Sequence, residues 1–184
     1  AGVGLGSDTV TATPIGATSA PTVAATPDDT TAAIAVGEPA SLNGSAVTSY
    51  TASIALSSGG SAIETVTLDP TDATYTFQNL TNGTSYRVSV TATNEAGESA
   101  AGTATVVPAT SAGAPTNVRA RPGSIIVTWD APVSTGGATI TEYMITVTSE
   151  DGFQSDYLAS SATNSATTSG CSVAGRTCTI LKVI

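Results

Sequence analysis

The most regular pattern in the chain lies between Leu80 and Gly97, where the sequence reads LTNGTSYRVSVTATNEAG. From Tyr86 onward, apolar and polar side chains alternate. The apolar positions are Tyr86, Val88, Val90 and Ala92. Successive side chains of a strand point to opposite faces, so a period of two predicts a strand with one buried face. The turn residues on either side of this segment predict its two ends.

Similar alternation, interrupted by Gly, Pro, Asp or Asn, predicts further short strands at 32–36, 47–56, 63–68, 74–80 and 103–107. In the longest of these, Tyr50, Ala52, Ile54 and Leu56 fall on one face. No segment has a convincing helical period. Many short strands with a turn every 8–12 residues are typical of an antiparallel β-sandwich.

The pattern recurs once along the chain. Three landmarks keep a spacing of 93 residues: Val36 and Trp129, Pro39 and Pro132, and Tyr50 and Tyr143. A period of this length indicates a repeated domain instead of a solenoid repeat. We therefore expect residues 1–19 to be the last strand of a preceding module plus a linker, 20–110 a complete domain, and 111–184 a second domain.

The segment 80–97 resembles the E–F corner and F strand of fibronectin type III domains. The resemblance implies that Tyr86 is the corner tyrosine, with its hydroxyl bonded to upstream backbone and its ring in the core. Trp129 resembles the core tryptophan of the family's B strand, and 94–99 resembles its F–G turn. The implied fold is all-β, with tandem immunoglobulin-like antiparallel sandwiches. Leu80, Tyr50 and Tyr143 join Tyr86 and Trp129 as predicted structural residues.

Two departures from the family pattern carry predictions. Val36 stands where the family usually has Trp, so we expect Phe77 and Tyr50 to fill that volume. In the second repeat, Thr179-Ile180 aligns with Thr76-Phe77, which predicts a domain truncated after strand E. Either the sequence is a fragment of a longer array, or another chain supplies the missing strands.

The two cysteines, Cys171 and Cys178, lie close together in an insertion of the second repeat and in the strand after it. A zinc site needs about four ligands, and the chain has no His to add to them. A redox pair is more typically spaced Cys-x-x-Cys. The predicted arrangement is a local disulfide, which implies an oxidising compartment. Two free buried thiols are the alternative.

Charge and composition exclude several classes of function. The 14 acidic residues outnumber 5 basic ones, giving a net charge of −9, which disfavours nucleic acid and anionic membranes. No apolar run approaches the roughly 20 residues of a spanning helix, so no membrane insertion is expected. The absence of His excludes Ser–His and Cys–His nucleophilic mechanisms. We predict no enzyme activity, no cofactor and no metal.

The remaining motifs have ordinary structural explanations. The adjacent carboxylates Asp28-Asp29 and Glu150-Asp151 lie at predicted turns. Asp28, Asp29, Asp69 and Asp72 offer oxygen ligands for calcium, but they lack an EF-hand-like spacing. Three triplets, beginning at Asn43, Asn79 and Asn82, match the N-glycosylation pattern, although they are also common turn residues.

The Ala/Thr/Ser/Gly-rich, Lys-poor modules are similar to repeats of bacterial surface and exported proteins. This resemblance implies non-catalytic structural or adhesive spacer modules of an extracellular or cell-surface protein. Two alternatives are accessory modules of a secreted carbohydrate-active enzyme and the subunit of a strand-complemented filament. The expected partners are a protein or polysaccharide surface, and neighbouring modules or copies that complete the second domain.

Overall fold

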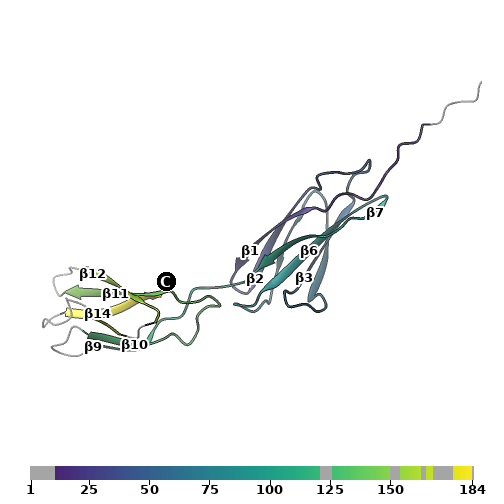
Figure 1. Cartoon of the computed structure of the whole chain (residues 1–184). Helices are drawn as coiled ribbons and strands as arrows, with labels where there is room; N and C mark the ends of the chain where they lie inside the picture. Colours follow the sequence, from purple (N-terminus) through teal and green to yellow (C-terminus); the bar gives the residue numbers. More distant parts are fainter. Residues whose placement is uncertain (1–10, 121–125, 150–153, 163–164, 168–175, 184) are drawn as a thin grey trace, which may run out of the picture. The chain divides into compact units, whose positions relative to one another are not determined.

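The computed structural model describes residues 11–120, 126–149, 154–162, 165–167 and 176–183, and every regular element in them is a strand (Figure 1). The chain divides into two compact units. The first comprises Ala1–Thr26, Ala32–Phe77 and Ser85–Val106; the second comprises Val107–Ile184 with the short loops Pro27–Thr31 and Gln78–Thr84. Within the described residues, no helix has the length and apolar character needed to cross a membrane.

Two antiparallel sheets make up the first unit. One has the order β1-β2-β5, with β1 (Thr22–Asp28), β2 (Thr31–Gly37) and β5 (Thr74–Phe77). The other has the order β4-β3-β6-β7, with β8 also paired to β6. Its strands are β3 (Ser49–Leu56), β4 (Glu64–Leu68), β6 (Tyr86–Asn94), β7 (Gly97–Glu98) and β8 (Gly102–Val106). The predicted all-β antiparallel fold class is confirmed.

The alternating pattern of β6 produces its buried face. Its four alternating apolar side chains, Tyr86, Val88, Val90 and Ala92, are all buried. In the register of the sheet they lie opposite Leu56, Ile54, Ala52 and Tyr50 of β3. Because neighbouring strands in register present the same face, the two alternations combine into one apolar surface.

The predicted strands differ from the observed ones at their ends. Ile63 precedes β4 and is 58% exposed, and Leu56 at the end of β3 is 40% exposed. The strand predicted at 74–80 ends at Phe77, because the backbone of Asn79 turns into the left-handed region with φ of 57°. Leu80 therefore lies outside β5, yet it is buried.

Val36 lies in β2, and it is half-buried. Phe77 and Tyr50 are among the largest fully buried side chains of the chain. The ring of Tyr75 packs edge-on against Phe77, with 5.1 Å between their centroids. The buried aromatic side chains of this unit thus lie on β3 (Tyr50), β5 (Phe77) and β6 (Tyr86), whereas β2 carries none.

Hydroxyl side chains cover the outer face of the larger sheet. Thr51 of β3 pairs with Thr67 of β4 and with Thr91 of β6, and the next row pairs Ser53 with Thr65 and Ser89. Cross-strand Thr and Ser neighbours suit a pleated surface that faces solvent. These two rows carry hydroxyl side chains and no charged residue.

The second unit also has two antiparallel sheets. The sheet β13-β10-β9 contains β9 (Thr116–Ala120), β10 (Ile126–Asp130) and β13 (Ser165–Thr167). The sheet β12-β11-β14 contains β11 (Glu142–Ser149), β12 (Gln154–Ser160) and β14 (Arg176–Val183). The core cluster consists of Val127, Trp129, Tyr143, Ile145 and Ala159. The rings of its two aromatic members meet edge-on, with centroids 5.2 Å apart.

The pairing of β14 corrects the strand assignment made from the sequence. In the second unit β14 pairs with β11, just as β6 pairs with β3 in the first. The short strand β13 pairs with β10, as β5 pairs with β2. The alignment of Thr179-Ile180 with Thr76-Phe77 is therefore wrong by one strand. It failed because β13 is a three-residue Ser-Ala-Thr strand without alternating apolar residues, so the sequence indicated only a loop there.

The register also shows what replaces the corner tyrosine. Tyr86 lies opposite Leu56, six residues after Tyr50. The matching position in the second unit, opposite Ser149, is Arg176.

Candidate functional site

Several acidic side chains of the described residues have structural partners, and they form no metal site. Among the described residues, no group of three or more His, Cys, Asp or Glu side chains is placed to hold a metal ion. Asp28 accepts a hydrogen bond from the backbone N–H of Asp29 at 2.8 Å. Asp29 in turn accepts from Nδ2 of Asn82 at 2.7 Å. This carboxylate pair therefore orders a turn, while Glu150-Asp151 falls outside the described residues.

The carboxylates Asp69 and Asp72 have similar structural partners. Asp69 Oδ1 accepts from the hydroxyl of Thr71 at 2.6 Å and from its backbone N–H at 2.8 Å. The hydroxyl bond, and then the backbone bond, lower the pKa of Asp69 below its usual value. Asp72 accepts from the hydroxyl of Thr74 at 2.9 Å. A carboxylate held ionised in an exposed turn is poorly suited to act as a general acid.

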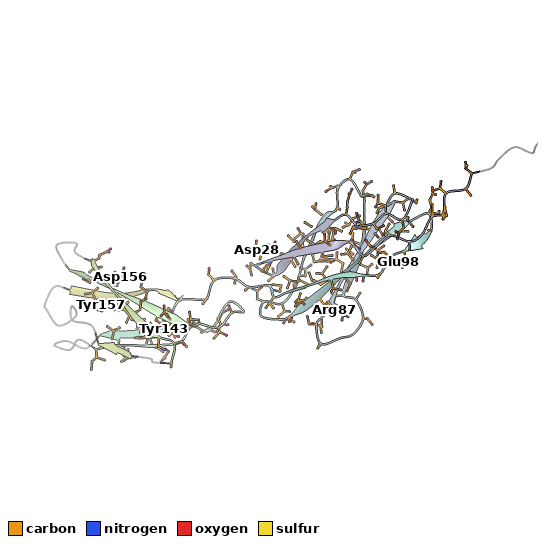
Figure 2. All side chains as sticks on the ribbon, turned by 45° about the horizontal axis from the view of Figure 1, so that its top comes forward. Asp28, Arg87, Glu98, Tyr143, Asp156 and Tyr157 are labelled. Carbon is orange, nitrogen blue, oxygen red and sulfur yellow. The ribbon has the colours of Figure 1, made fainter. Side chains whose placement is uncertain are left out.

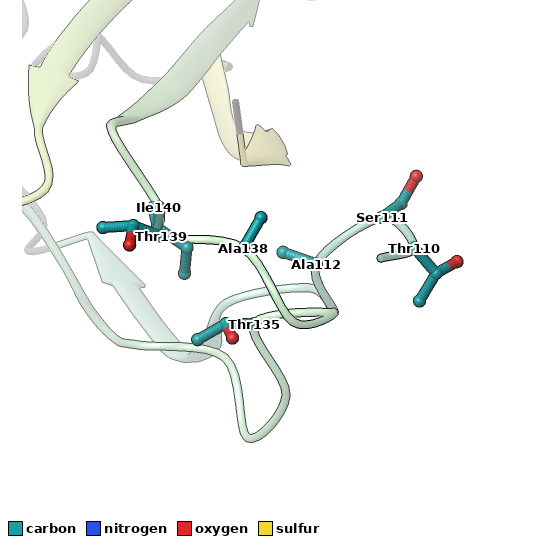
Figure 3. Close-up of a pocket in the computed structure, with 7 residues that line it drawn as sticks. All are labelled: Thr110, Ser111, Ala112, Thr135, Ala138, Thr139 and Ile140. Carbon is teal, nitrogen blue, oxygen red and sulfur yellow. The ribbon is translucent and has the colours of Figure 1, made fainter. Parts of the chain in front are cut away.

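A small hollow of about 190 Å³ lies in the second unit (Figure 3). It is lined by Thr110, Ser111, Ala112, Thr135, Ala138, Thr139 and Ile140. The lining offers hydroxyl and methyl groups but no charged side chain. It lies between the linker that leads into this unit and the loop before β11, and it resembles imperfect loop packing more than a ligand pocket, whose volumes are typically larger.

The five predicted structural residues are all buried. Their exposed fractions are 4% for Tyr86, 5% for Leu80, 2% for Trp129, 1% for Tyr50 and 2% for Tyr143. They pack the cores and offer no surface for a partner. Burial, followed by the nearby charge of Glu38, raises the pKa of Tyr50. Trp129 Nε1 has no hydrogen-bond partner among the described residues, and we have no physical account of that.

The predicted cystine falls partly outside the described residues. Cys171 is not described, and Cys178 is known only by its place in β14, opposite Val147. The disulfide stays a prediction.

The structure places an unexpected set of contacts at the end of the first unit where the chain arrives. We call this the N-side end; it comprises residues 14–19, the loop 41–45 and the turn 94–97. The backbone N–H of Gly16 donates to the carbonyl of Asn43, and that of Ser19 donates to the carbonyl of Ser41, both at 2.9 Å. Nδ2 of Asn43 donates back to the carbonyl of Ala17 at 2.6 Å. The arriving segment is thus fastened to the loop 41–45.

Asn94 joins the three parts of this end. Its side chain is buried, and its Nδ2 donates to the carbonyl of Gly16 at 2.8 Å, with longer contacts of 3.4 Å to the carbonyls of Leu42 and Ser45. Its Oδ1 accepts from the backbone N–H of Ala96 at 3.0 Å. The sequence predicted only a turn at this residue. The bond from Asn94 to Gly16 could not be predicted, because the two residues are 78 positions apart in the chain.

The second unit repeats the same backbone pairing with its own arriving segment. Thr110 N–H donates to the carbonyl of Gly136 at 2.8 Å, and Gly113 N–H donates to that of Ser134 at 2.9 Å. These carbonyls occupy the positions of Asn43 and Ser41 in the 93-residue period. The turn residues at both places have positive φ: 49° and 88° at Asn43-Gly44, and 70° and 93° at Gly136-Gly137. Each arriving linker is therefore built into the unit that follows it.

The chain leaves the first unit at the opposite end. Strand β8 ends at Val106, which pairs with Tyr86, the first residue of β6, whereas Asn94 is the last. Eight steps along β6 at about 3.3 Å each separate the two ends by about 26 Å. Figure 1 shows the N-terminal segment reaching the unit beside β7, and Figure 2 places Glu98 of β7 toward that end and Arg87 of β6 toward the other.

Part of the chain matches a known family model. Residues 18–107 match the family model of the fibronectin type III domain. Among solved structures, the chain is similar to domains A168–A170 from titin, with 23% identity and a TM-score of 0.44, covering 50% of this chain and 32% of that one. It is also similar to the FN1–FN3 domains of chicken CNTN1, with 17% identity and a TM-score of 0.46, covering 86% of this chain and 58% of that one. No match was found among curated proteins.

Proposed function

Residues 18–107 match the fibronectin type III family model, and from this match we propose that the chain is a run of non-catalytic spacer modules in an extracellular or cell-surface protein. Domains of this family are typically extracellular and are not catalytic by themselves. A fold hosts many functions, so the proposal rests on how this chain passes through its units.

The observation that carries the proposal is the placing of arrival and departure at opposite ends of the first unit. The arriving segment is bonded at Gly16 and Ser19, and the departing strand ends at Val106, about 26 Å away along β6. A module with this arrangement lengthens a chain by its own long dimension. A module whose ends met at one side would be a side branch and would add little reach.

The composition of the surface also supports a spacer function. The outer face of the larger sheet presents rows of Thr and Ser, and the chain has few aromatic residues and a net charge of −9. Interface hot spots are enriched in Trp, Tyr and Arg. The only Trp of the chain and the tyrosines Tyr50, Tyr86 and Tyr143 are buried in cores. A hydroxylated sheet face, with these aromatic side chains kept in the cores, suits a spacer that holds other domains apart.

A tethered-layer measurement tests the proposal. The chain is attached to a flat surface through its C-terminal end and carries a reporter domain at its N-terminal end. Neutron reflectometry then gives the height of the reporter layer. Removing 18–107 should lower the layer by about 26 Å, the span of the module along β6.

The control is sedimentation of the same two proteins in solution. Both must be monomers, so that a change in layer height does not come from self-association. An unchanged layer height after the deletion would contradict the spacer function, because the module would then add no length between the surface and the reporter.

A further inference from the structure

The loop 41–45 carries a reactive dipeptide at the point where the arriving segment is fastened. We propose that Asn43-Gly44 is a site of spontaneous deamidation, and that this reaction releases residues 14–19 from the first unit. The proposal follows from the hydrogen bonds around the two Asn-Gly dipeptides of the chain, and it is independent of the spacer function.

The reaction needs water and no enzyme. The backbone nitrogen of Gly44 gives up its proton to a base in solution and attacks Cγ of Asn43. A C–N bond forms and closes a succinimide ring, and the Nδ2 group leaves as ammonia. Water then opens the ring at either carbonyl, which leaves Asp or isoaspartate at position 43. The net change is one water consumed and one ammonia released, with no oxidation or reduction.

The surroundings of Asn43 leave the nucleophile of this attack open, although Nδ2 of Asn43 itself donates to the carbonyl of Ala17 at 2.6 Å. Gly44 has no side chain to shield its nitrogen, and its N–H makes no hydrogen bond among the described residues. Asn43 itself is exposed. The hydroxyl of Ser41 donates to Oδ1 of Asn43 at 2.6 Å, and a donor on that oxygen draws electron density from Cγ and favours attack there.

The second dipeptide, Asn82-Gly83, is protected by comparison. The N–H of Gly83 donates to the carbonyl of Pro108 at 2.8 Å, so the nucleophile is engaged. Asn82 is half-buried, its Oδ1 accepts from the backbone N–H of Thr30 at 2.9 Å, and its Nδ2 donates to the carboxylate of Asp29 at 2.7 Å. Bonds to a charged group are roughly twice as strong as neutral ones, so this side chain is held away from the reactive geometry.

The product at position 43 loses the contact that fastens the arriving segment. Nδ2 of Asn43 donates to the carbonyl of Ala17, whereas a carboxylate has only acceptors and would face that carbonyl without a hydrogen. Isoaspartate also lengthens the backbone by one carbon, which displaces the carbonyl of residue 43 that accepts from Gly16. The second unit has Gly136 at this position, so its own linker is not subject to this loss.

The experiment uses the full chain, incubated at mildly alkaline pH and sampled over time. Peptide mapping by mass spectrometry measures deamidation at Asn43 and Asn82 in the same samples. Both amides must give up a bond from Nδ2, but that of Asn82 is charge-assisted, and only the Gly83 N–H must also leave a carbonyl, that of Pro108. We therefore expect Asn43 to react at least about tenfold faster. Asn43→Gly, which copies the second unit, should abolish the reaction at this site. Equal rates at the two sites, or no reaction at Asn43, would overturn the proposal.

A second readout tests the structural consequence. Amide hydrogen exchange at Gly16 and Ser19 should speed up in step with deamidation, and Asn43→Asp should show the faster exchange from the start. Exchange at Thr110 and Gly113, which pair with the glycine-containing loop of the second unit, should not change. Undiminished protection of Gly16 and Ser19 in fully deamidated protein would overturn the release step.

Discussion

Replacing Asn94 by Ala should loosen the N-side end of the first unit. The substitution removes one donor and one acceptor: Nδ2, which bonds the carbonyl of Gly16 at 2.8 Å, and Oδ1, which bonds the N–H of Ala96 at 3.0 Å. A buried polar group left without a partner costs about 1–3 kcal/mol. Ala96 is exposed and can turn to water, so its share is small. We therefore expect the free energy of unfolding of the first unit to fall by about 2–3 kcal/mol.

Asn94→Asp separates the donor from the acceptor. The carboxylate keeps an oxygen for Ala96 N–H but presents a negative charge to the carbonyls of Gly16, Leu42 and Ser45. Repulsion in this buried place raises the pKa of the introduced carboxyl, because the neutral form can donate again. The folded state then holds a proton that the unfolded state releases, so stability should rise as pH falls toward that pKa.

The assay is urea unfolding of the full chain followed by circular dichroism, combined with amide exchange at Gly16. Asn94→Ala should shift the transition of the first unit and speed exchange at Gly16, whereas Asn94→Asp should be the less stable of the two at neutral pH. A change below about 0.5 kcal/mol for Asn94→Ala, the size of an ordinary surface effect, would refute the reasoning. So would a pH-independent loss in Asn94→Asp.

Three further predictions concern other parts of the chain. Tyr86→Ala should lower the free energy of unfolding of the first unit by about 3–5 kcal/mol, because it empties a fully packed aromatic site; a urea midpoint that barely moves would contradict the assigned register. The hydroxyl of Tyr75 donates to Glu64 at 2.5 Å, which raises its pKa, so this bond contributes below about pH 10 and is lost as pH rises through the folded value. The free energy of unfolding should therefore fall less steeply with rising pH in Tyr75→Phe than in the wild type, and identical pH profiles would count against the bond. Cys171 and Cys178 should form an intramolecular disulfide; intact mass that does not increase on reduction, or free thiols in unreduced protein, would disprove it.

Much of the first unit could be predicted from local pattern. The alternation from Tyr86 to Ala92 gave both the strand and its buried face, because a half-buried strand imposes that period on its own sequence. The 93-residue spacing gave the repeated architecture and placed Tyr50 and Tyr143 at matching core positions. The first feature depends on neighbouring residues and the second on direct repetition of the sequence, so neither requires knowledge of tertiary contacts.

The features that escaped prediction depend on contacts distant in sequence or on weak local signals. Asn94 bonds Gly16 across the domain, and the fastening of each linker uses backbone groups that leave no mark in the sequence. The strand β13 was missed because Ser165–Thr167 has no apolar alternation, and that error shifted the assignment of β14. Register, which only pairing reveals, was needed to show that Arg176 stands at the place of Tyr86.

One distance tests the central claim, that the first unit carries the chain from one end to the other. Spin labels are placed at Ile15→Cys and Thr105→Cys, both exposed residues of the first unit, in a full chain whose own cysteines are replaced by Ser, and pulsed dipolar spectroscopy measures their separation. We expect a single distribution centred at about 23 Å or more, set by the seven steps along β6 from Arg87, the partner of Thr105, to Asn94. A separation of about half that span, with both labels at one end of the unit, would contradict it.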